Sequence, residues 1–158
     1  MEKIIVGISD VKTCTEPAEI VTYALGSCVG ICMRDGVNGV SGMAHIMLPD
    51  STAIVTECNK MKFADTGIEL LYNELIKNGA IPSRLTAKIA GGANMFGTIS
   101  NTMNIGERNV EATKKQLAKL GVPITAEDTG LDYGRTIKFY SEDGSLLVMS
   151  SLKGNKTI

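Results

Sequence analysis

Residues 28–48 read CVGICMR, then DGVNG, then VSGMAHIML, which are two apolar runs separated by five residues typical of turns. The runs at 28–34 and 40–48 have the length and composition of β-strands, and the Asp, Asn and Gly residues at 35–39 favour a tight turn. This pattern predicts an antiparallel hairpin. With the turn centred near Val37, Cys28 lies opposite residues 45–47 and within one diagonal step of His45.

Two helices are predicted farther along the chain. Residues 62–78 place apolar side chains at helical spacing, and Gly79 follows as a C-terminal cap. Residues 107–120 carry an acid near their start and lysines towards their end, with Gly121 beyond. Further strands are expected at residues 4–8, 20–25, 84–90, 124–127, 136–140 and 145–150. Runs of strands with two inserted helices predict a layered α+β fold.

The composition indicates a single globular domain over residues 1–158. Apolar residues make up 44% and charged residues 21% of the 158, which is close to the average for folded proteins. No repeat or low-complexity tract marks a linker. Sixteen Lys and Arg stand against 17 Asp and Glu, so no strong field attracts nucleic acid or an anionic membrane.

The protein is expected to be cytoplasmic, with reduced thiols. The N-terminal apolar run is too short for a signal peptide, and no stretch approaches the roughly 20 apolar residues of a membrane span. Without a secretion signal, the four cysteines at positions 14, 28, 32 and 58 are interpreted as free thiols rather than two disulfides.

Cys28 and His45 are the candidates for chemistry. His45 is the one histidine of the chain, and an adjacent imidazole can take the proton of a thiol that is otherwise only slightly ionised at neutral pH. Gly26 and Ser27 indicate a tight entry to Cys28, where backbone N–H groups can face an oxyanion. Thr22 is the candidate third member of a catalytic triad, because its hydroxyl or carbonyl can orient the imidazole. The competing interpretations are that Cys28 is a small core residue and Thr22 a common strand residue.

Two other sites compete for the same residues. Three cysteines and His45 could form a zinc site, but Cys28 and Cys32 are about 13 Å apart in a strand, whereas two thiolates on one zinc are at most about 4.6 Å apart. Cys28 and Arg34 have the spacing of a phosphatase loop, but no helix follows to receive a phosphate. We therefore expect neither a metal nor a cofactor.

A glycine-rich loop follows the strand expected at 84–90 and reads GGANMFG over residues 91–97. It lacks the lysine and spacing of a nucleotide-binding loop. The loop is either a simple turn or a wall of the active site, which presents Met95 and Phe96 to a protein substrate.

Several blocks of this sequence resemble the CheD family of chemoreceptor glutamine deamidases. The first are LGSCV at 25–29 and GMAHIMLPD at 42–50, followed in the same order by blocks at 62–66, 87–96, 104–109 and 126–130. The resemblance covers roughly residues 4 to 150, although residues 51–61 match no family pattern. Several blocks in order are far more specific than any single motif.

The resemblance implies a Cys-His-Thr triad of Cys28, His45 and Thr22, which converts receptor glutamines to glutamates through a thioester. It also implies an α/β sandwich of mixed and antiparallel sheets, similar to the deamidating domain of cytotoxic necrotizing factor toxins. The implied partners are the cytoplasmic domains of methyl-accepting chemotaxis receptors and the phosphatase CheC. The alternative is a mainly non-catalytic adaptor that binds CheC and receptors.

Overall fold

The computed structural model describes residues 1–53, 59–95 and 104–158. Within these residues, strands form two five-stranded sheets. The first, here the outer sheet, contains in spatial order β1 (Glu2–Ile5), β3 (Ala18–Leu25), β8 (Arg135–Tyr140), β9 (Leu146–Ser150) and β10 (Gly154–Thr157). The second, here the central sheet, contains β2 (Asp10–Cys14), β5 (Val40–Ile46), β4 (Val29–Asp35), β6 (Thr86–Gly91) and β7 (Ile124–Thr129).

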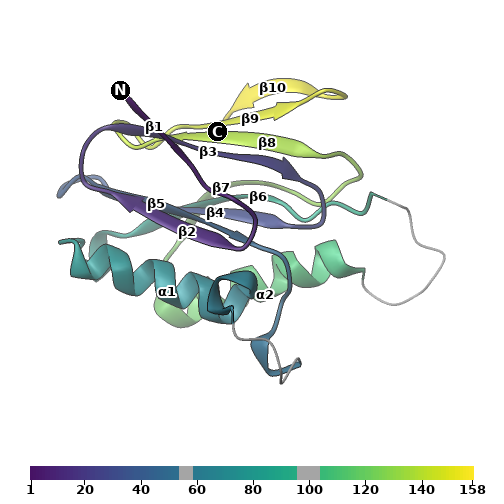
Figure 1. Cartoon of the computed structure of the whole chain (residues 1–158), viewed down its shortest axis with the longest axis horizontal. Coiled ribbons are helices and arrows are strands. Elements are labelled where there is room, and N and C mark those ends of the chain that lie inside the picture. Colours follow the sequence, from purple (N-terminus) through teal and green to yellow (C-terminus); the bar gives the residue numbers. More distant parts are fainter. Residues whose placement is uncertain (54–58, 96–103) are drawn as a thin grey trace.

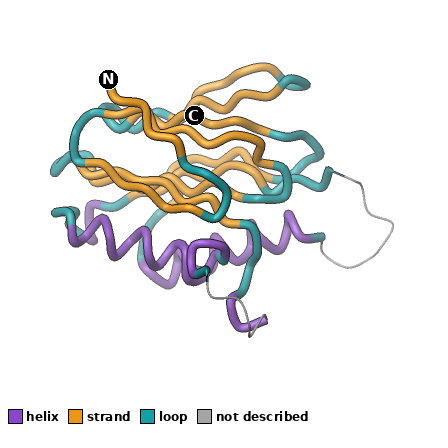
Figure 2. The backbone as a smooth tube through the Cα atoms, in the orientation of Figure 1, coloured by secondary structure: helices purple, strands orange, loops and turns teal. Residues whose placement is uncertain are grey.

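The molecule has three layers (Figure 1), with the central sheet between the outer sheet and the helices α1 (Ala64–Lys77) and α2 (Ile105–Leu120). Short 3₁₀ turns lie at Ser51–Ala53, Lys60–Lys62 and Pro82–Arg84. Strands and helices keep to separate layers in the tube view, and loops connect them (Figure 2). Both sheets are mixed, because β1 runs parallel to β3 and β6 parallel to β7. The predicted layered α+β class is confirmed.

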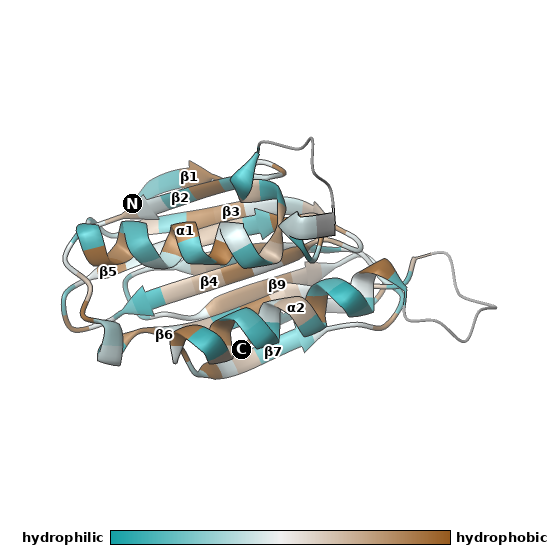
Figure 3. Ribbon diagram, turned by 90° about the horizontal axis from the view of Figure 1, so that it is seen from below, coloured by the Kyte–Doolittle hydropathy of each residue, from teal (hydrophilic) through white to brown (hydrophobic). Residues whose placement is uncertain are grey.

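Two apolar cores hold these layers together. Ile31, Ile46, Ile68 and Leu71 belong to the core between the central sheet and the helices, which lie over the sheet and run roughly along its strands in Figure 3. Residues such as Ile20, Met43 and Ile137 form the core between the two sheets. Because the central sheet is covered on both faces, β4 and β5 are buried almost throughout, which explains their nearly continuous apolar runs.

The predicted hairpin of residues 28–48 is confirmed as β4 and β5, with Val29 opposite Ile46 and Gly30 opposite His45. The second strand is shorter than expected. It ends at Ile46, because the N–H groups of Met47 and Leu48 bond to the carbonyl of Lys62 instead of continuing the ladder.

Other boundaries also differ from the sequence prediction. The first strand ends at Ile5 rather than residue 8, because the chain turns at Ser9, which has a positive φ of 58°. The unpredicted strand β2 follows that turn. Helix α2 begins at Ile105 rather than residue 107, because the Asn104 side chain accepts a 3.0 Å hydrogen bond from the N–H of Glu107 and caps the helix. No helix in the described part of the chain is both long and apolar enough to cross a bilayer.

Candidate active site

Thr22 and His45 meet in the core between the two sheets. Thr22 comes from β3 of the outer sheet and His45 from β5 of the central sheet, and both are fully buried. The hydroxyl oxygen of Thr22 lies 2.7 Å from Nδ1 of His45 and 2.7 Å from the carbonyl oxygen of Val6. The chain thus brings together two of the three residues predicted as a triad.

This hydrogen-bond network assigns the proton of the imidazole. The Thr22 hydroxyl has one proton and donates it to the Val6 carbonyl, which can only accept. The same oxygen must therefore accept from Nδ1–H of His45. In the neutral ring this leaves the lone pair on Nε2, so Nε2 is the atom that can act as a base.

The environment of His45 keeps the ring uncharged. Nε2 is buried and has no hydrogen-bond partner among the described residues. Burial lowers the pKa of His45 to about 4, because desolvation disfavours the imidazolium. The imidazole is therefore neutral at physiological pH.

Cys28 lies one residue before β4, on the side of the strand that packs against the core between the sheets. Because Gly30 is opposite His45 in the ladder, Cys28 is a diagonal neighbour of His45. No hydrogen bond joins the two side chains, since Nε2 is unpartnered. Burial raises the pKa of the Cys28 thiol, and a hydrogen bond from its own backbone N–H opposes this shift only in part. The free protein therefore holds a neutral thiol beside a neutral imidazole.

Gly30 provides space between the sheets beside His45. A Cβ at this position would lie 2.7 Å from Cδ1 of Ile137 and 3.3 Å from Cδ1 of Leu25. Both atoms are the ends of side chains, so a larger residue at this position would have to displace Ile137 where β4 passes beneath the outer sheet.

The loop after β6 holds the backbone around Cys28. The N–H of Gly92 donates to the carbonyl of Cys28 at 2.8 Å, and the N–H of Ala93 donates to the carbonyl of Gly26 at 2.9 Å. Gly91 has a φ of 113°, and a Cβ there would overlap the carbonyl oxygen of Cys28. The first residues of the glycine-rich loop singled out in the sequence thus form one side of the site, because they hydrogen-bond to the backbone at Gly26 and Cys28.

Met95 lies at the edge of this side of the site. Its side chain is 46% exposed, and its Cγ would lie 3.5 Å from a Cβ at Gly26, two residues before Cys28. Phe96, the other residue predicted for this surface, lies outside the described residues. An exposed apolar side chain therefore borders Gly26, two residues before the candidate nucleophile.

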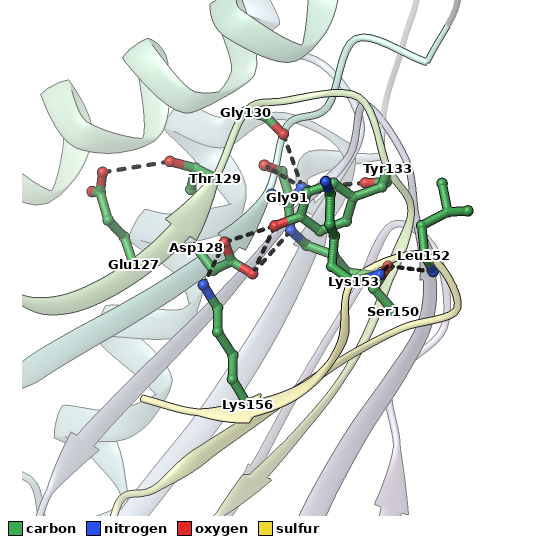
Figure 4. Close-up of polar contacts among 11 residues, drawn as sticks. Gly91, Glu127, Asp128, Thr129, Gly130, Tyr133, Ser150, Leu152, Lys153 and Lys156 are labelled. Carbon is green, nitrogen blue, oxygen red and sulfur yellow. Dashed lines mark hydrogen bonds and ion pairs between the residues drawn. The ribbon is translucent and has the colours of Figure 1, made fainter.

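A buried ion pair supports the same loop from the other sheet (Figure 4). Nε of Arg135 lies 3.3 Å from the Asp128 carboxylate, which also accepts from the Tyr133 hydroxyl at 3.2 Å and pairs with Lys156 at 3.3 Å. Nη1 of Arg135 donates to the carbonyl of Gly91 at 3.4 Å. Burial alone would raise the pKa of Asp128, but Arg135 and Lys156 hold it below its ordinary value.

The zinc alternative has little support in this geometry. Cys32 is fully buried within the core between the sheets, where burial raises the pKa of its thiol and so disfavours the thiolate that a metal requires. Over the ranges that the structure describes, no group of three or more His, Cys, Asp or Glu side chains is arranged to hold a metal ion.

Asn109 is a site residue that the sequence interpretation missed. It is fully buried on α2, and its Nδ2 donates to the carbonyls of Ser27 and Met47, each at 2.9 Å. The signals in the sequence are its place in the family-like block at 104–109 and a polar residue at a position of helical spacing where an apolar one is expected. Neither signal says what the side chain contacts.

Comparisons with known proteins agree on one family. A family model described as "CheD chemotactic sensory transduction" matches residues 47–150. The chain is 57% identical over 155 residues to the probable chemoreceptor glutamine deamidase CheD of Caldanaerobacter subterraneus subsp. tengcongensis, covering 97% of this chain and 96% of that protein. It is 49% identical over 156 residues to the chemoreceptor glutamine deamidase CheD of Halalkalibacterium halodurans, covering 97% and 96%.

Among solved structures, the chain is similar to the Bacillus licheniformis hypothetical protein YfiH, with a TM-score of 0.53. The match covers 78% of this chain and 51% of that one, at 17% identity. At this identity the likeness shows the shared fold alone.

Proposed function

This chain belongs to the CheD family, and from that membership we propose that it hydrolyses glutamine side chains of methyl-accepting chemotaxis receptors to glutamate, with Cys28 as nucleophile. The similar proteins are named chemoreceptor glutamine deamidases, which identifies the reaction and the class of substrate. The proposal transfers both to this chain.

One observation carries the proposal. The bond from Nδ1–H of His45 to Thr22 leaves the lone pair of Nε2 without a partner, in the same core that Cys28 packs against. A buried imidazole with one unpaired nitrogen costs folding free energy, so its presence favours a role that uses that nitrogen. Taking a proton from the neighbouring thiol is the reaction that the pair supports best.

In the proposed first half-reaction, Nε2 of His45 takes the thiol proton as Sγ of Cys28 attacks the carboxamide carbon. Backbone N–H groups of Gly26, Ser27 and Cys28 stabilise the oxyanion that forms. The imidazolium then returns its proton to the leaving nitrogen, ammonia departs, and a thioester joins Cys28 to the receptor. Because both groups begin neutral, the proton transfer accompanies the attack rather than preceding it.

In the second half-reaction, His45 takes a proton from water, and the hydroxide attacks the thioester carbon. The carbon–sulfur bond breaks, and Sγ of Cys28 recovers a proton from the imidazolium. The products are the receptor glutamate and the free enzyme. Thr22 acts as a positioning residue, which holds the ring with Nε2 as the free nitrogen.

The other properties that the family resemblance implies are part of the same proposal. Residues 1–158 act in the cytoplasm as one deamidase domain that needs no metal or cofactor, and a CheC-type phosphatase regulates it. The resemblance to the cytotoxic necrotizing factor domain stays a prediction. The adaptor alternative does not account for the contacts of Thr22 and His45, since binding CheC needs no buried imidazole.

Purified protein mixed with a receptor cytoplasmic fragment tests the proposal. Intact-mass measurement and peptide mapping should show glutamine converted to glutamate, both with and without a chelator. Cys28→Ala should abolish the conversion, whereas Cys32→Ala, on the same face of β4, should keep it. A receptor fragment that stays unmodified would favour the adaptor hypothesis. Loss of activity when a chelator removes a bound metal would favour the zinc-site hypothesis.

A further inference from the structure

The buried side chain of Asn109 links the segment that carries Cys28 to the end of the strand that carries His45. We propose that Asn109 is a positioning residue of the deamidation site, which keeps the thiol and the imidazole in register. The inference rests on the proposed function, because it concerns the alignment of the same two groups. Asn109 lies on α2 and is not a member of the predicted triad.

The contacts of Asn109 reach both catalytic segments. Its Nδ2 has two protons, and both are used, one on the carbonyl of Ser27 and one on the carbonyl of Met47, each at 2.9 Å. Ser27 directly precedes Cys28. Met47 follows His45 by two residues, at the point where the chain leaves β5. One amide group therefore joins the two segments through their backbones.

Packing alone does not explain an asparagine at this position. Asn109 is fully buried, and its Oδ1 has no hydrogen-bond partner among the described residues. An unpaired buried acceptor costs folding free energy, whereas a leucine, which branches in the same way, would pack α2 without that cost. The two donor contacts are what the asparagine supplies and leucine does not.

The catalytic pair depends on such a link. No hydrogen bond joins Cys28 to His45, so their separation is determined by the backbones on which they stand. Thr22 fixes the ring of His45 from the outer sheet but does not contact the Cys28 segment through any hydrogen bond of the described residues. Displacement of a reacting group by 1 Å lowers a rate by about 10²-fold. Loss of the amide should therefore lower kcat.

Helix α2 offers a matched control one turn farther along the same face. Thr113 is also fully buried, and its hydroxyl is also unpartnered among the described residues. Thr113→Val removes a polar atom from the same helix face without touching the bonds to Ser27 and Met47. This control distinguishes a general loosening of α2 from the specific loss of the hydrogen bonds to Ser27 and Met47.

The experiment compares Asn109→Leu and Thr113→Val with the wild type. In Asn109→Leu, kcat for receptor deamidation should fall by about 10- to 100-fold with KM nearly unchanged. The pH profile of Cys28 alkylation by iodoacetamide should move to higher pH, because the thiol loses its aligned base. Thr113→Val should keep the wild-type kcat and profile. If Asn109→Leu does not fold, the smaller Asn109→Ser is measured instead and should show the same direction of change.

A folded Asn109 variant with wild-type kcat and a wild-type alkylation profile would overturn the inference. Equal losses in Thr113→Val would also overturn it, because they would show a general effect of disturbing α2. A wild-type protein that leaves the receptor unmodified would instead contradict the proposed function. The alkylation profiles need no receptor, so they test the link independently of the substrate.

Discussion

The hydroxyl of Thr22 lies 2.7 Å from Nδ1 of His45, although the two residues stand on different sheets. The same hydroxyl donates to the carbonyl of Val6, so the direction of every proton in the chain Val6–Thr22–His45 is determined. The consequence is a ring whose only free lone pair is on Nε2. Orientation of the imidazole is thus the contribution of the outer sheet to the candidate site.

Replacing Thr22 tests this arrangement. Thr22→Val keeps the volume but removes the acceptor for Nδ1–H, and turnover should fall by about 10²-fold because the ring loses its orientation. Thr22→Ser keeps the hydroxyl and should retain most of the activity. Steady-state kinetics on both variants measures turnover, and circular dichroism checks that they are folded. A well-folded Thr22→Val with near-normal turnover would remove Thr22 from the mechanism.

Cys28 should be the first thiol to react with a mild alkylating agent. Cys14 and Cys28 are both partly buried, but Cys28 has His45 as a diagonal neighbour, and Cys32 is fully buried with a raised thiol pKa. Peptide mapping after brief exposure to iodoacetamide identifies the labelled cysteine, and loss of activity should follow labelling of Cys28 in proportion. Faster labelling of Cys14, or full activity in Cys28→Ala, would contradict the assigned nucleophile.

Acid should destabilise the protein through His45. The pKa of His45 is about 4 in the folded chain and about 6.5 when unfolded, so between these values the unfolded chain binds the additional proton. The stabilisation is therefore complete above pH 6.5 and is lost as the pH falls towards 4, by about 3 kcal/mol. Urea unfolding across this range should show the loss, and His45→Gln should show a weaker dependence. Deamidation should likewise persist below pH 6.5, since the base stays neutral there.

The pair of Arg135 and Asp128 should contribute strongly to stability. Both side chains are buried, and Arg135→Met leaves the carboxylate without its buried partner, which should cost about 3–5 kcal/mol of unfolding free energy. Lys156 pairs with the same carboxylate from a side chain that is 56% exposed, so Lys156→Met should cost less than about 1 kcal/mol. Denaturant titration compares the two variants, and equal costs would contradict the assignment of the buried pair as the main contact.

Met95 should contribute to receptor docking rather than to folding. Its exposed side chain borders the Cys28 segment, so Met95→Ala should raise KM for the receptor several-fold, by roughly 1 kcal/mol, with little change in Tm. CheC should slow receptor deamidation by competing for the same surface. The control is Val37→Ala, in the exposed turn at the opposite end of β4 from Cys28. Simultaneous binding of CheC and receptor without mutual effect would reject the shared surface.

The sequence predicted the elements that have a continuous apolar run or apolar residues at helical spacing. The hairpin of β4 and β5 followed from two apolar runs around a turn, and both helices followed from apolar spacing and glycine ends. Strand β10 was missed because all four of its residues are exposed, so no hydrophobic pattern marks it. Strand β2 was missed because it is a half-buried edge strand without a continuous apolar run. Its position depends on pairing with β5.

The arrangement of the two sheets could not be predicted from the sequence, and the candidate site depends on that arrangement. The hairpin register placed Cys28 near His45, because both stand on one local element. Nothing local shows that Thr22 faces His45 across the core or that Asn109 reaches Ser27 and Met47, since those contacts join separate layers. Arg135 reads as an ordinary strand residue until its position beneath the Gly91 loop is known.

The order in which the chain leaves the ribosome bears on when the imidazole beside this thiol becomes oriented. Cys28 and His45 share a hairpin that can form early, but Thr22 stands on β3, which pairs with β8, and β8 pairs with β9 near the end of the sequence. Contacts between such distant segments form late in folding. A nascent chain therefore carries a cysteine and a histidine without an oriented base. The imidazole therefore gains its orientation only when the outer sheet is complete, which requires strands from both ends of the chain.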